Sequence, residues 1–301
     1  MARSGKTAPK QPEAARAQSI TSRDNSWLKQ FRALLAGDRR DGGLLGVEGL
    51  RLVEAALGSG LGVTALLVSE SGERHMARIA SLLAGPTQIL RTSDKLFASV
   101  ADTQMPQGIA ALVQRPKASV EDLMQPSALL VMLVGVQDPG NVGTILRAAE
   151  AFGATGAATC SANGVGTADP FGPKAMRASA GSTLRIPVVH GSPGASLVTK
   201  LRAAGVKIYA AVATAEDHAG RKPPAGSSVL LPWEADWKSS VVILIGNEGA
   251  GLPEELVRGA DARVTIPQAT ATTPIGVESL NAAMAATVLL YEAMRQRSAL
   301  R

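Results

Sequence analysis

Three short segments in the second half of the chain place glycines and polar side chains directly after apolar runs. The first is Asp138-Pro-Gly-Asn-Val-Gly-Thr-Ile-Leu-Arg147, which follows the apolar run 129–136. A turn of this kind opens a helix whose first amides lack intrahelical partners and attract oxygen-rich ligands. Asn141 lies where it can cap this helix or hold a ligand, and Arg147 lies further along the same helix. Taken alone, a β-turn, a cap and a surface arginine explain the segment equally well.

The second segment, 243–253, combines an apolar run with the glycines Gly246, Gly249 and Gly251. Glycine permits positive φ and a close approach of the backbone to a ligand. Glu248 stands between the glycines, and no turn requires a glutamate there. The pattern is neither G-x-G-x-x-G nor a Walker A loop, so it does not support a Rossmann dinucleotide site. A loose turn between a strand and a helix remains the alternative.

The third segment begins with Ile266-Pro267 and continues to Glu278-Ser-Leu-Asn281, which opens the last helix. Ser279 is a possible N-cap, and Asn281 then falls in the first turn, where its amide can donate and accept hydrogen bonds. Alanines at 282, 283, 285 and 286 keep this helix thin. A thin helix can pack closely against another helix or a threaded chain.

These segments need an α/β domain to bring them together. From residue 128 onward, fully apolar strands alternate with helices, which indicates a parallel sheet covered on both faces. The expected strands are 129–136, 154–159, 186–189, 207–212, 241–245 and 263–266, and the expected helices are 142–152, 174–180, 195–204 and 279–297. The Pro- and Trp-bearing stretch 222–237 is expected to be an insertion on the surface.

The first half of the chain predicts a second, smaller α/β unit. Residues 25–35 form an amphipathic stripe, and Ser93 is a plausible N-cap of a later helix. The expected strands are 44–47, 63–69, 88–90 and 108–113, and the expected helices are 25–35, 48–58, 73–83 and 93–101. The predicted domains are a disordered basic tail at 1–20, an N-terminal domain at 21–115, a linker at 116–127 and the C-terminal domain at 128–301.

Composition narrows the class of protein. The chain has 301 residues, with 31 Lys+Arg against 25 Asp+Glu, and this net charge of +6 supports an acidic partner only weakly. Cys160 is the one cysteine, and the three histidines form no HExxH, so we expect no disulfide and no metal. The first residues lack a signal peptide, and no apolar run reaches membrane-spanning length, so we expect a cytoplasmic protein without a membrane segment.

The order and spacing of the three segments, over residues 129–297, resemble the SpoU (TrmH-like) family of knotted RNA 2′-O-methyltransferases. The N-terminal domain is similar to the L30e-like RNA-binding domain that many members carry. The resemblance implies a trefoil-knot α/β domain that acts as a homodimer and transfers a methyl group from S-adenosylmethionine to a ribose 2′-hydroxyl in structured RNA. Ribosomal RNA is preferred over transfer RNA because of the sizeable N-terminal domain. That domain offers basic residues for phosphate contacts, namely Arg51, Arg74, Arg78, Arg91 and Lys95.

The resemblance also assigns roles to the residues of the three segments. It implies catalytic roles for Asn141, Arg147, Glu248, Ser279 and Asn281, and cofactor binding by Gly246, Asn247, Gly251, Ile266, Pro267 and Leu280. Arg147 is expected to enter the same pocket as Glu248, Ser279 and Asn281. Whether it acts as a base or as a fixed cation stays open, since arginine normally remains protonated. The link 268–275 is longer than in most members and should lie near the cofactor.

Three alternatives belong to other classes. A non-catalytic RNA-binding protein on the same fold should have lost polar groups from the motifs, yet Asn141, Arg147 and Glu248 remain. A Rossmann oxidoreductase or methyltransferase should carry a glycine fingerprint after its first strand, and Asp138-Pro-Gly-Asn-Val-Gly143 does not fit one. A base methyltransferase with a related knot is disfavoured by the Asn…Arg and Ser-Leu-Asn set.

Overall fold

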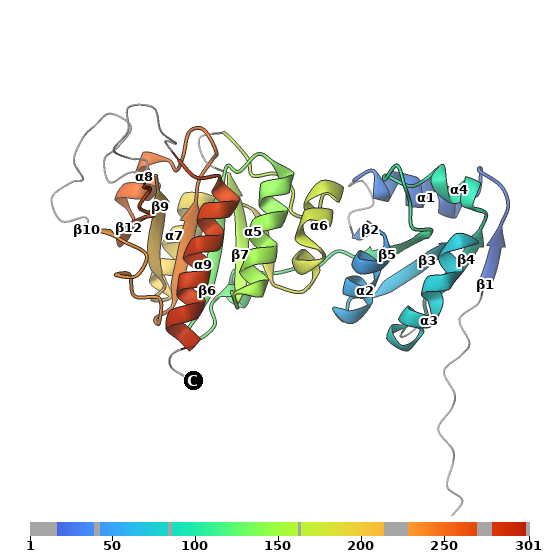
Figure 1. The fold of residues 1–301 in the computed structure, drawn as a ribbon, viewed down its shortest axis with the longest axis horizontal. Coiled ribbons are helices and arrows are strands. Elements are labelled where there is room, and N and C mark those ends of the chain that lie inside the picture. Colours follow the sequence, from blue (N-terminus) through green and yellow to red (C-terminus); the bar gives the residue numbers. More distant parts are fainter. Residues whose placement is uncertain are drawn as a thin grey trace, which may run out of the picture. The chain divides into compact units, whose positions relative to one another are not determined.

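The computed structural model describes residues 17–38, 43–83, 86–161, 164–213, 228–269 and 279–298. These residues form two compact units, and the chain passes from one to the other between Arg115 and Pro116 (Figure 1). No helix within these ranges combines the length and the apolar character needed to cross a membrane.

The N-terminal unit is a five-stranded sheet in the order β1-β4-β3-β5-β2. Strands β1 and β3 run parallel to β4, whereas β5 runs antiparallel to β2 and β3. The strands are β1 (Ala17–Ile20), β2 (Leu44–Glu48), β3 (Val63–Ser69), β4 (Gln88–Thr92) and β5 (Ile109–Gln114). The helices are α1 (Ser26–Leu35), α2 (Leu50–Gly58), α3 (Met76–Ile79) and α4 (Asp94–Ala98), with 3-10 turns at Ser71–His75 and Ala80–Leu82.

The amphipathic stripe of α1 packs this unit. Leu28, Phe31 and Leu34 are buried in one apolar cluster with strands β3, β4 and β5. Two helix starts are set by side chains that accept backbone amides: Asn25 caps α1, and Ser93 caps α4 by accepting from the amide of Leu96. The predicted N-cap role of Ser93 is confirmed.

The prediction of a disordered tail through residue 20 is wrong at its end. Ala17–Ile20 is strand β1, which pairs with β4, and the Ile20 side chain is buried. The Thr92 hydroxyl also donates to the carbonyl of Ile20. The four residues carry no apolar alternation of their own, so the strand depends on a partner distant in sequence. The rest of the predicted tail, residues 1–16, lies outside the described residues.

The C-terminal unit is a seven-stranded parallel sheet in the order β10-β12-β9-β11-β6-β7-β8. The strands are β6 (Leu129–Val134), β7 (Gly156–Ser161), β8 (Val188–Pro193), β9 (Lys207–Val212), β10 (Ser228–Leu230), β11 (Val241–Ile245) and β12 (Ala262–Thr265). The helices are α5 (Pro139–Ala151), α6 (Pro173–Ser179), α7 (Gly194–Ala203), α8 (Glu254–Arg258) and α9 (Ala282–Ser298), with 3-10 turns at Glu121–Leu123 and Ser182–Leu184.

Strands β6 and β11 form the centre of this sheet, and every residue of both is buried. Helices α7 and α8 cover one face, where Leu201 and Leu256 pack in a single cluster with Leu130 and Leu244. Helices α5 and α9 lie side by side over the other face (Figure 1). Leu123, in the predicted linker 116–127, is buried in the α7–α8 cluster, so that stretch packs on this unit.

Part of the predicted surface insertion 222–237 is instead core. Trp237 is fully buried, its indole nitrogen donates to the carbonyl of Pro232, and its ring meets Tyr209 edge-on. The prolines and the lack of a regular apolar pattern in this stretch suggested a surface position, whereas the Trp–Tyr contact requires no such pattern. Residues 222–227 lie outside the described residues. Residues 270–278, between β12 and α9, also lie outside the described residues, and the expected knot stays a prediction.

Replacing Ile20 tests whether β1 belongs to the folded N-terminal unit. The substitution Ile20→Ala should lower the free energy of unfolding by about 2–5 kcal/mol, because it leaves a cavity beside β4. Urea denaturation of the full chain measures this change. The matched control is Ser19→Ala, at an exposed position of the same strand, which should be nearly neutral. Equal effects of the two substitutions would contradict the burial of β1.

Candidate active site at the carboxyl ends of β6 and β11

The carboxylate of Glu248 joins the loop after β11 to the turn after β6. It accepts hydrogen bonds from the side-chain amide of Asn141 at 2.9 Å and from the backbone amides of Gln137 and Asp138 at 3.3 Å each. Partial burial alone would raise the pKa of this carboxyl. The hydrogen bonds from Asn141 and the backbone outweigh burial and lower the pKa, so the group is ionised at neutral pH.

Asn141 extends this contact to a third element, helix α9. Its side-chain oxygen accepts from the amide nitrogen of Asn281 at 3.1 Å. The side-chain oxygen of Asn281 in turn accepts from the amides of Ala283 at 2.8 Å and Met284 at 3.3 Å, so Asn281 is the N-cap of α9. The polar network Glu248–Asn141–Asn281 therefore ties together the ends of β11, β6 and α9.

The capping roles differ from those that the sequence suggested. Ser279 precedes the actual cap of α9 and is exposed, and within the described residues no hydrogen bond joins it to the network. Asn141 lies inside the first turn of α5, because Asp138 is the cap and accepts from the amide of Gly140 at 3.0 Å. The Asp-Pro pair could have revealed this, since proline is favoured at the first helical position after a capping aspartate.

Asp138 also holds helix α6 beside the site, a contact that the sequence analysis missed. Lys174 donates to its carboxylate at 2.7 Å. The hydrogen bond from Lys174 and the one from the amide of Gly140 lower the pKa of the Asp138 carboxyl. Asp138, three residues before Asn141, therefore carries a negative charge that is paired with a cation from helix α6.

The glycine-rich loop after β11 is closed on itself. The backbones of Asn247 and Gly251 exchange two hydrogen bonds of 3.0 Å, and a side chain at Gly246 would overlap the backbone of Gly251. The Asn247 side chain donates to the carbonyl of Gly135 at 2.8 Å and accepts the amides of Gly249 and Ala250. The side chain of Asn247 thus braces the loop against the end of β6.

Gly143, the glycine of the first motif, is required by packing. A Cβ at this position would overlap the carbonyl oxygen of Ala175 and the side chain of Ala178, both in α6. Helices α5 and α6 make an extensive contact here. The glycine therefore lets α6 approach α5 closely, which places Lys174 within reach of Asp138.

Arg147 does not join the network within one chain. Six residues at 100° each put its side chain about 120° around the α5 axis from that of Asn141. It is exposed, and no hydrogen bond between described residues of a single chain joins it to Glu248, Ser279 or Asn281. The sharing of one pocket by these four residues therefore stays a prediction.

The remaining predicted residues supply apolar surface at the same end of the sheet. Two of them follow β12: Ile266 is half-buried and Pro267 is exposed. Leu280, which precedes the α9 cap, is 39% exposed. Exposed apolar side chains beside this glycine-rich loop suit a nucleoside cofactor with an adenine ring. Residues 270–275 of the long link lie outside the described residues.

The described residues include no cluster of metal ligands, and their one cysteine is buried. In the described ranges, no three His, Cys, Asp or Glu side chains gather as a metal site would require. Burial raises the pKa of the Cys160 thiol to about 12, so it is not a nucleophile.

The fold and the site together define an α/β protein of the methyltransferase type, with an ionised carboxylate and two carboxamides at the carboxyl ends of parallel strands. Residues 128–291 match the model of the SpoU rRNA methylase family, and residues 25–111 match the MRM3-like substrate-binding domain. The chain belongs to the SpoU rRNA methylase family, as the motifs predicted.

Two curated relatives and one solved structure indicate the range of the family. The 23S rRNA (guanosine(2553)-2′-O)-methyltransferase of Bacillus subtilis is 33% identical over 91% of this chain and 98% of its own. The 23S rRNA (uridine(2479)-2′-O)-methyltransferase of Streptomyces viridochromogenes is 33% identical over 93% of each chain. The AdoMet-bound rRNA methyltransferase of Sinorhizobium meliloti is 32% identical, with a TM-score of 0.73, over 93% of this chain and 98% of that one. The predicted family and α/β fold class are confirmed.

The packing role of Gly143 can be tested by adding one methyl group. Gly143→Ala should lower the midpoint of thermal unfolding and reduce methyl transfer, because α6 must move away from α5 and take Lys174 with it. Overpacking of this kind typically costs about 1–3 kcal/mol. Gly166→Ala is the control, since a Cβ there meets nothing within 4 Å. If Gly143→Ala behaved like the control, the close contact of the two helices would be wrong.

Proposed function

We propose that this chain transfers the methyl group of S-adenosylmethionine to a ribose 2′-hydroxyl of ribosomal RNA. The polar network Glu248–Asn141–Asn281 carries the proposal, because it is the one arrangement of described residues that assembles all three motifs of the family at one place. A ribose hydroxyl offers one donor and two acceptors, which match carboxylate and carboxamide partners.

For this methyl transfer, the protein must mainly orient the two reactants and stabilise the charge that develops on the ribose oxygen. S-adenosylmethionine supplies an already activated methyl group, so no metal is needed. The ribose hydroxyl is weakly acidic, so the site must hold its oxygen in line with the methyl group and stabilise the negative charge that develops on it. We assign the orientation of the ribose to Asn141 and Asn281, with Ser279 at the rim, and the fixing of Asn141 to Glu248.

We further propose that the protein is a homodimer in which Arg147 serves the site of the partner subunit. Arg147 points away from its own network, yet α5 lies against α9, whose outer face carries the exposed apolar residues Met284, Val288 and Tyr291. These residues have helical i, i+4, i+7 spacing, and the Tyr291 ring packs edge-on against Phe152 after α5. Such a stripe suits burial against a second copy.

In this arrangement, the guanidinium of Arg147 is a fixed cation near the oxygen that becomes alkoxide. Arginine stays protonated in proteins, so electrostatic stabilisation is the role that its chemistry favours. The ribose oxygen would form a bond to the methyl carbon as the carbon–sulfur bond of the cofactor breaks, which leaves S-adenosylhomocysteine. The proton of the hydroxyl would pass to solvent or to a neighbouring acceptor.

The N-terminal unit is proposed to recognise the RNA. Its match to a substrate-binding domain supports this role. Of the five basic residues singled out from sequence, Arg78 and Arg91 form ion pairs with Glu54 and Glu73, and Arg74 donates a hydrogen bond to His75. Arg51 and Lys95 are therefore proposed as the better candidates for phosphate contacts. Both named relatives act on 23S rRNA, which supports ribosomal RNA and a cytoplasmic site of action, but they modify different nucleosides.

The target is tested by mapping 2′-O-methyl groups in RNA from cells with and without the gene. One ribosomal position should lose its methyl group in the deletion and regain it with the wild-type gene, but not with Asn141→Ala. Loss at a transfer RNA position alone would overturn the choice of ribosomal RNA. Unchanged methylation in both RNA classes would favour the non-catalytic alternative.

Mixed dimers test whether Arg147 acts across the interface. Arg147→Ala and Asn141→Ala should each reduce methyl transfer by about 10²-fold or more, with S-adenosylmethionine binding nearly intact in Arg147→Ala. In a mixed dimer, a shared site places both lesions in one pocket and leaves the other intact, so activity should return to a large fraction of one wild-type site. Activity that stays at the level of the single variants would mean that Arg147 serves its own chain.

A further inference from the structure

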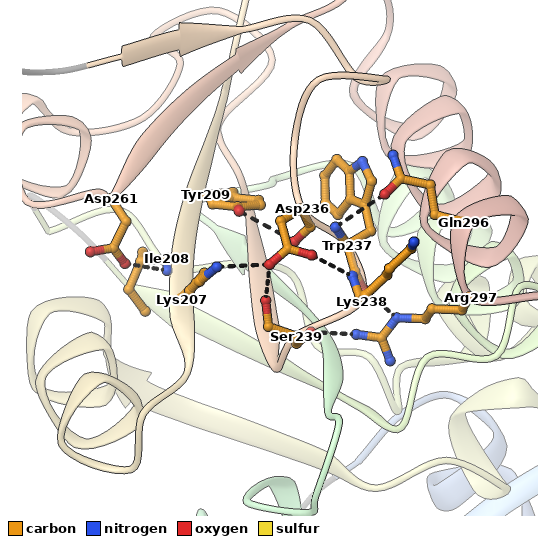
Figure 2. Close-up of polar contacts among 10 residues, drawn as sticks. All are labelled: Lys207, Ile208, Tyr209, Asp236, Trp237, Lys238, Ser239, Asp261, Gln296 and Arg297. Carbon is orange, nitrogen blue, oxygen red and sulfur yellow. Dashed lines mark hydrogen bonds and ion pairs between the residues drawn. The ribbon is translucent and has the colours of Figure 1, made fainter. Parts of the chain in front are cut away.

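The last turn of α9 carries Arg297, whose side chain donates to four backbone carbonyls. The Nε of Arg297 donates to Trp237 at 2.6 Å, and its two terminal nitrogens donate to Ser127 at 2.5 Å, Ser239 at 2.8 Å and Ala128 at 3.1 Å. Figure 2 shows the guanidinium reaching from α9 to the segment that carries Trp237 and Ser239. Every one of these acceptors is a neutral carbonyl, and partial burial lowers the pKa of Arg297.

The four carbonyls belong to the segments that lead into two particular strands. Ser127 and Ala128 precede β6, and Trp237 and Ser239 precede β11. The two segments are also joined directly, because the amide of Val241 donates to the carbonyl of Ala128 at 2.9 Å. Arg297 therefore ties the amino ends of β6 and β11 to the carboxyl end of α9.

Both segments are shaped to present these carbonyls. Ser127 has a φ of 56°, a left-handed conformation that is unfavourable for a residue with a Cβ. On the other side, the carboxylate of Asp236 accepts from Lys207 at 2.8 Å and from the Ser239 hydroxyl, which holds the turn before β11 (Figure 2). A planar guanidinium with five donors fits such diverging acceptors, and an ammonium does not.

We propose that Arg297 is a positioning residue for the methyl-transfer site, acting from the opposite end of the sheet. The elements that it joins, β6, β11 and α9, are the same three whose other ends meet in the network Glu248–Asn141–Asn281. Asn281 lies sixteen residues before Arg297, about 24 Å along a continuous helix. The guanidinium thus fixes the axial position of α9 and with it the contact between Asn281 and Asn141. The inference rests on the proposed roles of those two residues.

The test compares Arg297→Ala and Arg297→Lys with two control variants in the full-length protein. Both Arg297 variants should lower kcat at saturating RNA and cofactor by roughly tenfold or more, because small misplacements of a catalytic group are costly. Free guanidinium chloride, kept well below denaturing concentrations, should restore part of the kcat of Arg297→Ala. Arg258→Ala, the first control, removes an exposed ion-paired arginine of α8. Its kcat should equal that of the wild type, and guanidinium chloride should not raise it.

A second control separates positioning from stability. Leu201→Ala in α7 leaves a core cavity and should lower the midpoint of thermal unfolding at least as much as the Arg297 variants do, while kcat below the transition stays near wild type. A loss of kcat in the Arg297 variants that merely tracked the folded fraction, as in Leu201→Ala, would overturn the proposal.

Hydrogen exchange gives a readout that does not depend on activity. In Arg297→Ala, the amides of Ala283 and Met284, which Asn281 caps, should exchange faster, while those of α7 stay protected. Unchanged protection at these two amides would contradict the positioning role, even if the chain proved to methylate a different RNA. Faster exchange with unchanged kcat would confirm that Arg297 positions α9 but would contradict the roles proposed for Asn141 and Asn281 in methyl transfer.

Discussion

One side-chain amide, that of Asn141, joins the three parts of the candidate site. It donates to the Glu248 carboxylate and accepts from Asn281, so it needs a donor on one side and an acceptor on the other. Aspartate would set two negative groups against each other, and an apolar residue would leave Glu248 and Asn281 without their partner. The requirement for a carboxamide at this position is therefore physical, and the glutamate and asparagine of the other two motifs follow from it.

The sheet makes this meeting possible. Because β6 and β11 are adjacent and parallel, the turns that follow them come to the same edge, where ligands bind in open parallel sheets. Three residues then position the helices. Asp138 caps the start of α5, Gly143 allows α6 to pack closely against α5, and Asn281 caps α9 and contacts Asn141 of α5. At the other end of the sheet, Arg297 ties the amino ends of the same strands to the end of α9.

Much of this organisation could be predicted from sequence because its signals are local. Apolar runs identified the buried strands, and the Ser93 cap and the stripe of 25–35 identified helices. The three motifs marked the residues that meet at the site. What failed depends on tertiary context: β1 exists through its pairing with β4, Trp237 is buried by Tyr209, and Asn281 takes the cap that Ser279 seemed to offer. The role of Arg147 stays a prediction, since a motif gives the spacing of residues along a helix but not what the exposed Arg147 side chain contacts.

The central claim is that the network Glu248–Asn141–Asn281 serves transfer to a ribose oxygen. The most direct measurement incubates the purified chain with methyl-labelled S-adenosylmethionine and ribosomal RNA, and then hydrolyses the RNA with alkali. A 2′-O-methyl group blocks cleavage at its own nucleotide, so the label should appear in an alkali-resistant dinucleotide. Label recovered in single nucleotides would place the methyl group on a base and contradict the account.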